Sequence, residues 1–369
     1  MSQEFFTNLP SHITIDILSR LPIPTILRCK SVCKPWLHLL NSHEFTTHHL
    51  SESAPGLAVF QSKITSEIHE IYEFEDELDL DVEHRYKLLT AFKLPSHGLI
   101  QGSANGLLLI MPPEGLSICN PITREYMDIR TPQDSNYKHP QKFTFGFGVS
   151  TRTRQYKVVM FSHDPEKDKR LGFLQSECHV YTLGTGSWRR SAAPCLSYGS
   201  YCNGAFLNGN LHWLGFDANS KAWISCFDLE TELLSTISPP TTDQQLLVAD
   251  VFAFGDKLCV CDSWSEDEIV VWLMEEYGDE KSWRKEFVVV KREDMYGECV
   301  VRPIKVFKDG EMAMLWGDFF VFHWCSKRGT VSEMRMFEAR GNCALDLIPH
   351  TPTFLSLSKS FGAMENVSS

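Results

Sequence analysis

The spacing of hydrophobic residues changes along the chain, near residue 50. Between Leu9 and Leu40, Ile and Leu recur every three or four residues, as in the series Ile13, Ile17 and Leu21. This spacing is typical of one face of a helix. From about residue 98 onward, short apolar runs and alternating positions are separated by turn residues, which is typical of β-strands. The pattern therefore predicts a mainly β protein that begins with a small α domain.

The helical stretch predicts three short helices, at about residues 10–20, 24–32 and 35–42. Pro10, Pro24 and Pro35 stand where these helices begin. Proline is tolerated there because the first N–H groups of a helix have no partner inside it. Three short helices cannot bury all these apolar side chains among themselves, so we expect part of their surface to contact a partner.

The strand candidates form a loose repeat. Asn105-Gly106, Asn208-Gly209 and Asp309-Gly310 are signals for tight hairpins. Related phrases, such as NGLLLI, NGNLHWL, GDKLCVC and DGEMAMLW, return at intervals of roughly 40–50 residues or about twice that. Eight of the nine tryptophans lie between residues 188 and 324, where they would pack between sheets. Four-stranded units at this period predict a β-propeller of about six blades.

These patterns predict three segments: a helical domain at 5–50, a β-propeller-like domain at 51–360, and a flexible tail at 361–369. The acidic stretch EIHEIYEFEDELDLDVEH, at 67–84, belongs to a transitional part of the second segment. We interpret this stretch as an exposed strand or edge with a loop, although such acidic blocks also mark interaction surfaces.

Composition narrows the function classes. The 369 residues are 43% hydrophobic and 22% charged, as in soluble globular proteins, and the net charge is -12. This charge argues against a nucleic-acid partner or an anionic membrane surface, because both require a basic footprint. The start MSQEFFTNLP lacks the features of a secretion signal, and no run is long enough to span a bilayer. We therefore expect a protein of the cytoplasm, the nucleus or both.

No catalytic or metal-binding motif stands out. The twelve cysteines include no Cys-x-x-Cys pair, so we expect them to be structural rather than metal ligands. GFGVST, at 146–151, lies between strands and is a weak candidate for a phosphate cradle. His48 and His49 are expected at the surface or in a loop. The chain is therefore predicted to be no enzyme and to need no cofactor or metal.

Five arginines are the main candidates for gripping acidic or phosphorylated ligands. A solvated position at a strand end is the simpler expectation for them. They are Arg124, Arg152, Arg154, Arg189 and Arg190.

The stretch LPSHITIDILSRLPIPTILRCKSVCKPWLHLL resembles an F-box. The matching positions are Leu9-Pro10, Ile17-Leu18, Leu21-Pro22, Leu27, Val32-Cys33-Lys34, Trp36 and Leu39-Leu40. Two positions depart from the family pattern. Ser11-His12 replaces an acidic residue that often follows Leu-Pro, and Pro24 stands where many members carry Lys, which puts the affinity for an adaptor in doubt.

The remainder resembles the F-box-associated region of the large plant F-box families. Its landmarks are GSANGLLLI, CNPITREYMDI, FGFGVSTRTRQYKVVMF, VYTLGTGSWRR and NGNLHWLGF. The two resemblances imply a substrate receptor of an SCF ubiquitin ligase, whose helices bind a Skp-type adaptor and through it a cullin. The β domain would bind a protein substrate, of which the sequence identifies neither the residues that bind it nor the pathway.

The resemblance implies an adaptor-binding set in the F-box. Its members are Leu9, Pro10, Ile13, Ile17, Leu18, Leu21, Pro22, Leu27, Val32, Cys33 and Trp36.

Two alternatives stay open. One is a non-catalytic propeller scaffold that acts outside ubiquitination. The other is a propeller hydrolase or lyase with catalytic residues in the central channel. The second is disfavoured because no convergent set of His, Asp and Glu was found on the strands that begin each blade.

Overall fold

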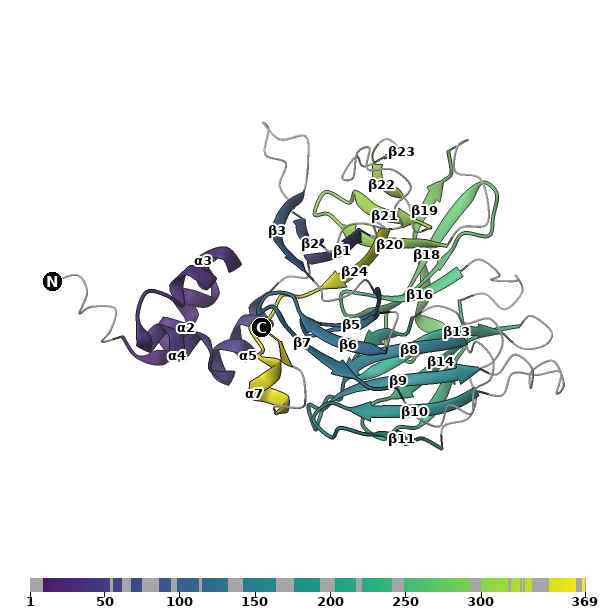
Figure 1. Ribbon diagram of the computed structural model, residues 1–369. Coiled ribbons are helices and arrows are strands. Elements are labelled where there is room, and N and C mark those ends of the chain that lie inside the picture. The colour runs from purple at the N-terminus through teal and green to yellow at the C-terminus, as the bar shows by residue number, and fades with distance from the viewer. Residues whose placement is uncertain are drawn as a thin grey trace.

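A computed structural model shows a small helical unit beside a ring of β-sheets (Figure 1). The residues that the structure describes are 9–53, 56–61, 68–74, 86–93, 98–112, 115–131, 142–163, 176–192, 203–216, 221–240, 249–292, 300–317, 320–325, 327, 329–333, 345–362 and 367–368.

Four helices make up the helical unit in the described chain. They are α2 (Ser11–Ser19), α3 (Ile23–Cys29), α4 (Lys34–Leu40) and α5 (His43–Glu52). Pro10 and Pro22 immediately precede α2 and α3, while Pro24 and Pro35 lie in the first turns of α3 and α4. The prolines therefore mark helix starts, as predicted.

Helix α5 was not expected. Its segment, SHEFTTHHL, has little apolar periodicity, so its sequence does not read as a helix. Two features fix it: the Ser42 hydroxyl accepts a hydrogen bond from the Phe45 N–H at 3.1 Å, and the Phe45 ring is fully buried. The first is an N-cap, and the second anchors the helix in the core.

The strands of the described residues form six antiparallel sheets, five with four strands and one with five. Four of them are each built from consecutive strands. The first two contain β8 (Lys142–Val149), β9 (Tyr156–His163), β10 (Ser176–Thr182) and β11 (Trp188–Arg190), and then β12 (Ala205–Leu207), β13 (Asn210–Phe216), β14 (Ala222–Asp228) and β15 (Leu234–Ile237). The next two contain β16 (Ala249–Phe254), β17 (Lys257–Asp262), β18 (Glu268–Met274) and β19 (Trp283–Val290), and then β20 (Val301–Val306), β21 (Met312–Trp316), β22 (Phe320–Cys325) and β23 (Thr330–Glu333).

The other two sheets draw strands from distant parts of the chain. They are β24 (Leu345–His350) with β1 (Gly56–Gln61), β2 (Ile68–Phe74) and β3 (Tyr86–Lys93); and β4 (Leu99–Ala104), β5 (Leu107–Met111), β6 (Leu116–Asn120) and β7 (Glu125–Ile129) with β25 (Val367–Ser368). Strand β24 pairs with β1 over its whole length, so the last sheet of the chain is also the first and the ring is closed. The expected fold class, mainly β with helices before a propeller of about six blades, is confirmed.

The ring has two faces, which are told apart by the direction in which the inner strands run. In each sheet the innermost strand (β4, β8, β12, β16, β20 or β24) begins at one face and ends at the other. Gly56, where the chain leaves the helical unit, pairs with His350 at the end of β24. The face where inner strands end therefore carries the helices, and we call it the helix-side face. The face where inner strands begin is called the distal face.

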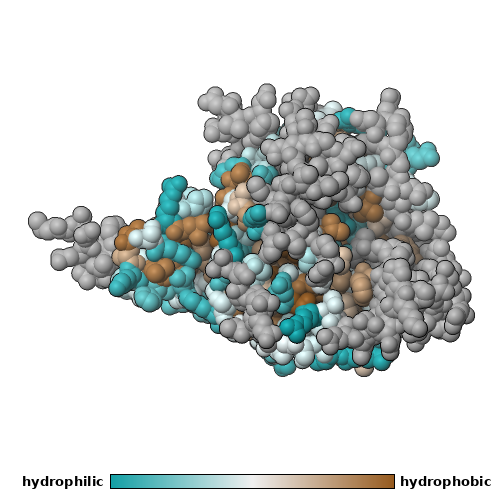
Figure 2. Space-filling view, viewed as in Figure 1, coloured by the Kyte–Doolittle hydropathy of each residue, from teal (hydrophilic) through white to brown (hydrophobic). Residues whose placement is uncertain are grey.

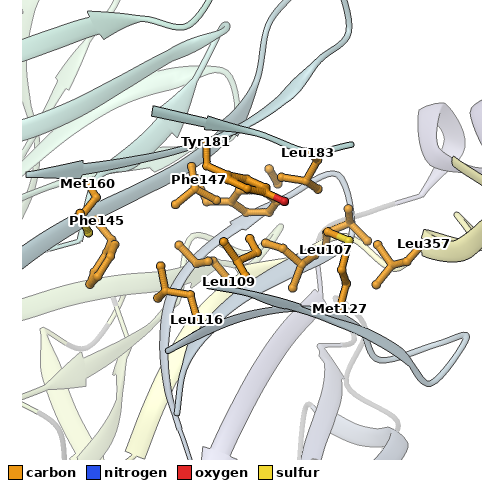
Figure 3. Close-up of a cluster of buried hydrophobic side chains, with 14 residues drawn as sticks. Leu107, Leu109, Leu116, Met127, Phe145, Phe147, Met160, Tyr181, Leu183 and Leu357 are labelled. Atoms are coloured by element: carbon orange, nitrogen blue, oxygen red, sulfur yellow. The ribbon is translucent and has the colours of Figure 1, made fainter. Parts of the chain in front are cut away.

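Neighbouring sheets pack through apolar side chains. Figure 3 shows one such cluster, in which Leu107 and Leu109 of β5 meet Phe147 of β8 and Tyr181 of β10. Leu357, fully buried on helix α7 (Leu357–Phe361), completes this cluster from the C-terminal segment. Each large apolar side chain buried at a junction stabilises the fold by about 2 kcal/mol. Because such burial is repeated at each junction, it holds the sheets in a ring.

Candidate interaction surfaces

The helical unit exposes large apolar side chains. Ile13 and Ile17, one turn apart on α2, are 39% and 45% exposed, and Leu27 on α3 is 37% exposed. Val32, in the turn before α4, is 64% exposed. Hydrophobic side chains are visible at the surface of this unit in Figure 2. Apolar side chains gathered in this way are typical of a protein-binding surface.

The remaining residues of the predicted adaptor-binding set divide by exposure. Pro10 and Pro22 are exposed, while Leu9, Leu21, Cys33 and Trp36 are half-buried. Leu18 is only 2% exposed and packs inside the helical core. It supports the surface from beneath.

Leu37 on α4 is an exposed apolar residue that the sequence reasoning did not select. Its side chain is 39% exposed. Leu37 directly follows Trp36 and comes four residues after Cys33. Its position on a short amphipathic helix is the feature of the sequence that could have identified it. We add it to the exposed apolar residues of the helical unit, which we call the helical apolar surface: Ile13, Ile17, Leu27, Val32 and Leu37.

The helical unit and the propeller share one hydrophobic core. Phe45 of α5 and Leu40 of α4 pack in a cluster with two propeller residues, Ile122 and Phe354, and all four are almost fully buried. Ile122 lies in the turn between β6 and β7, and Phe354 follows β24. We call this contact the seam. This apolar contact joins the helical unit to the propeller.

His49 lies in this seam and not at the surface, so the expectation for it is wrong. Its ring packs edge-on against Phe354, with centroids 4.9 Å apart, and its Nδ1 lies 3.0 Å from the Ser53 hydroxyl. Burial disfavours the charged imidazolium and lowers the pKa of His49 to about 4. Two adjacent histidines in a polar stretch gave no sign that one of them faces a core.

The distal face carries a second group of exposed apolar residues. Leu99 and Phe143 lie at the starts of inner strands β4 and β8 and are 50% and 40% exposed. Trp264, in the turn between β17 and β18, and Val290, at the end of β19, are 44% and 61% exposed. These residues come from three different sheets, so this face offers a broad surface built on rigid strands.

A cavity lies on the axis of the ring, between the inner strands β4, β12, β16, β20 and β24. Its charged lining residues in the described chain are Asp250 and Arg302, which form an ion pair across neighbouring sheets. Sequence reasoning missed this pair, since the two residues are separated by about fifty positions and no motif links them.

Three of the five candidate arginines are paired with glutamates. Arg152 contacts Glu230 at 3.2 Å, Arg190 contacts Glu177 at 3.3 Å, and Arg189 contacts Glu232. All three side chains are more than half exposed. These arginines are solvated, as the simpler expectation held, and each is paired with a glutamate. Within the acidic stretch, residues 68–74 form β2, which pairs with β1 and β3 and so is no edge strand, and Ile71 in it is fully buried. Residues 75–84 lie outside the described residues, so the interpretation of that part stays a prediction.

The glycines of GFGVST make room for aromatic rings. A Cβ atom on Gly146 would lie 2.5 Å from the Trp213 ring of the next sheet. One on Gly148 would lie 2.5 Å from the Phe206 ring. These contacts explain the glycines through packing and leave no reason to infer a phosphate site.

The cysteines of the described chain are free thiols, most of them buried. Burial raises the pKa of Cys119 and of Cys259, so their thiols stay protonated and unreactive. Within the described ranges, His, Cys, Asp and Glu form no group of three or more that could hold a metal ion. Among the same residues, no helix has the length and apolar character needed to cross a membrane.

Comparison with known families matches both parts of the chain. Residues 6–48 match the F-box domain, and residues 60–318, more than half of the chain, match the F-box associated beta propeller domain. Among curated proteins of Arabidopsis thaliana, F-box protein At3g07870 is 28% identical over 76% of this chain and 72% of its own length. F-box protein CPR1 is also 28% identical, over 83% of this chain and 79% of its own length.

Solved structures resemble the chain only weakly. TolB from Acinetobacter baumannii gives a TM-score of 0.37 at 12% identity, over 64% of this chain and 51% of that structure. A lectin from Aleuria aurantia gives 0.38 at 9% identity, over 78% of this chain and 97% of that structure. Similarity at this level supports no statement about the chain.

Proposed function

Because the chain belongs to the F-box proteins with an F-box associated beta propeller domain, we propose that it is the substrate-recognition subunit of an SCF-type ubiquitin ligase. The domain pair supports a substrate-receptor role in general, and the F-box supports binding of a Skp-type adaptor. In this proposal the adaptor links the chain to a cullin. The propeller binds a protein substrate, which is then ubiquitinated and degraded. The complex would act in the cytoplasm, the nucleus or both.

The observation that carries the proposal is the helical apolar surface. Ile13, Ile17 and Leu27 are each more than a third exposed, although the same unit has a buried apolar core into which such side chains could pack. A helical surface of this kind suits docking against an apolar groove of another helical protein. Each buried side chain would contribute about 1.5–3 kcal/mol to the complex, before the entropic cost of association.

The arrangement of the two surfaces supports a positional role. The helices attach at the helix-side face, and the seam joins them firmly to the propeller. A substrate held on the distal face would therefore keep a fixed position relative to the adaptor. We infer that the chain performs no chemistry itself and raises the effective concentration of substrate near the ubiquitin-carrying enzyme.

The test is adaptor binding by the full chain. Replacing Ile13 and Leu27 together by Asp buries two charges in the proposed interface, so we expect adaptor affinity to fall by at least about 100-fold. Leu233→Asp is the matched control, because Leu233 is 68% exposed and lies in a turn of the propeller. Isothermal titration calorimetry with a purified Skp-type adaptor measures both.

Unchanged affinity in the double variant would reject the assigned interface. Absence of adaptor binding by the unaltered chain would favour a propeller scaffold that acts outside ubiquitination.

A further inference from the structure

Charge is distributed unevenly along the chain. Residues 9–42, which contain α2, α3 and α4, hold four Lys and Arg residues against one acidic residue, a formal net charge of +3. The whole chain holds 35 Lys and Arg against 47 Asp and Glu, a net charge of -12, so the remainder carries -15. The three helices that expose the helical apolar surface are therefore a positive region on an acidic molecule.

Two of the four cations are engaged within the chain. Arg20 lies 2.7 Å from the carboxylate of Asp16, one turn earlier on α2, so these two charges cancel. Lys30 is half-buried at the seam, where its Nζ donates to the Asn41 side-chain oxygen at 2.9 Å and lies over the Phe354 ring. Neither side chain is therefore available to a partner of the helices.

The other two cations, Arg28 and Lys34, are exposed beside the helical apolar surface. Arg28 directly follows Leu27 on α3, and Lys34 begins α4 three residues before Leu37, on the same side of that helix. In the described part of the chain, neither cation forms an ion pair with a carboxylate. Figure 2 shows the hydrophobic side chains of this unit directly beside hydrophilic ones. We call Arg28 and Lys34 the positive rim.

An apolar centre with a positive rim fits a partner whose apolar groove is bordered by acidic residues. Rim charges stay hydrated, so they add little to the final affinity and act mainly by attracting the partner as it approaches. Most of this chain repels an acidic partner, and the rim supplies the local attraction that directs such a partner to the helices. Two cations are too few for a nucleic acid or an anionic membrane surface, which require a larger basic area.

We propose that the positive rim selects an acidic adaptor, a Skp-type protein whose apolar groove is bordered by Asp and Glu side chains. This inference rests on the proposed function and deepens it by naming the chemistry of the partner. The helical apolar surface supplies most of the affinity, while Arg28 and Lys34 set the rate of encounter. Among adaptors with the same groove, the chain binds the one with the most acidic border fastest.

The first experiment measures association and dissociation rates of the full chain with a purified Skp-type adaptor, by surface plasmon resonance. From about 50 mM to about 500 mM NaCl, the association rate should fall by about tenfold, because salt screens the attraction between exposed opposite charges. The dissociation rate should change little, since apolar contacts hold the complex together. An association rate that is constant or rises with salt would overturn the acidic border.

The second experiment reverses the rim with Arg28→Glu and Lys34→Glu together. At the lower salt concentration association should slow by about tenfold or more, and at the higher one the difference should nearly vanish. The matched control is Lys281→Glu with Lys308→Glu, which changes the net charge equally at two exposed positions of the propeller. The control should associate almost as fast as the unaltered chain. Equal slowing in both double variants would assign the effect to overall charge and overturn the role of the rim.

Neutral substitutions guard against misfolding of the reversed variant. If that variant melts at a lower temperature than the unaltered chain, Arg28→Gln with Lys34→Gln replaces it in the comparison. We expect this variant to associate about threefold more slowly at low salt, with an unchanged dissociation rate. Association as fast as that of the unaltered chain would overturn the proposal.

The outcomes separate this inference from the proposed function. Adaptor binding whose association rate depends neither on salt nor on the rim would overturn the inference and leave the proposed function standing. Absence of adaptor binding by the unaltered chain would reject both. A loss of affinity at every salt concentration is expected only for the Ile13→Asp, Leu27→Asp variant, because it alters the apolar surface itself.

Discussion

At the scale of single residues, close contacts decide how neighbouring sheets meet. Trp213 is fully buried, its indole N–H donates to the Phe145 carbonyl at 3.1 Å, and its ring crosses Phe161 at 83°. Gly146 leaves the space that this ring occupies. One missing methyl group on β8 therefore allows a large aromatic side chain of β13 to fill the junction.

Gly146→Ala should destabilise the protein. The added Cβ atom would lie 2.5 Å from Trp213 and 2.8 Å from Leu211, so a buried ring must move. We expect a loss of about 1–3 kcal/mol, measured as a lower midpoint of chemical unfolding. The same change should cost less when Trp213 is replaced by Phe, because the ring atoms that clash are then absent. Equal costs in both backgrounds would contradict this account.

At the scale of elements, helix α5 connects the two parts of the molecule. Phe45 and His49, one turn apart on α5, both pack against Phe354 of the segment after β24. Lys30 adds a cation–π contact, with Nζ 5.1 Å from the centre of the same ring. The helical unit is therefore held by a segment from the far end of the chain, more than three hundred residues away from it.

Phe354→Ala should loosen α5 from the propeller. Phe354 is 2% exposed, and truncation of a buried Phe typically costs about 3–5 kcal/mol. We expect faster hydrogen exchange in α5 and slower substrate ubiquitination, with adaptor affinity preserved. Leu357→Ala is the matched control: Leu357 is equally buried and near in sequence, but it packs between sheets. Equal exchange rates of α5 in both variants would show that the seam does not depend on Phe354.

At the scale of the whole molecule, buried histidines link stability to pH. His212 lies between the Ala205 carbonyl and the Tyr277 hydroxyl, at 3.1 and 2.8 Å, and burial lowers its pKa to about 4. His350 is 1% exposed, and burial lowers its pKa to about 3. With His49 of the seam, these residues come from separate parts of the fold, yet all three are neutral when folded.

Stability should fall as pH falls below 6.5. In the unfolded chain these histidines take up protons near pH 6.5, whereas in the folded protein they resist protonation until about pH 3–4. The unfolded state therefore binds more protons across this window, and acid favours unfolding. Each histidine should contribute roughly 1–3 kcal/mol to the loss, seen as a decreasing melting temperature from pH 7 to pH 4.5. A melting temperature that is constant or rises over this range would contradict the burial of the three rings.

Local patterns predicted much of the architecture. The prolines that begin the helices and the period of the hairpins depend on neighbouring residues, and both were readable. Helix α5 was not, because its stability comes from Phe45 packing in a core shared with Phe354. The strands before residue 98 were also hard to recognise, since β1 completes its sheet only by pairing with β24 near the end of the chain.

The candidate sites were predictable to different degrees. Exposed Ile13, Ile17, Leu27 and Val32 belonged to a contiguous pattern, so the sequence identified them, although adaptor contact by them remains a prediction. Leu18 belonged to the same pattern yet faces inward, because the direction of a side chain depends on how helices pack. No pattern could join Asp250 with Arg302, since only ring closure brings their strands together.

The sequence by itself determined the class of the protein: a helical F-box unit, a propeller of repeated strands, and the proline-marked helix starts. These features follow from short-range periodicity and backbone chemistry, which a linear chain displays directly. Only the tertiary structure decided that the helices contact the propeller through the seam, that the distal face points away from them, and that a cavity bordered by the Asp250–Arg302 ion pair lies on the axis. Each of these depends on contacts between residues far apart in the chain, which exist only once the ring has closed.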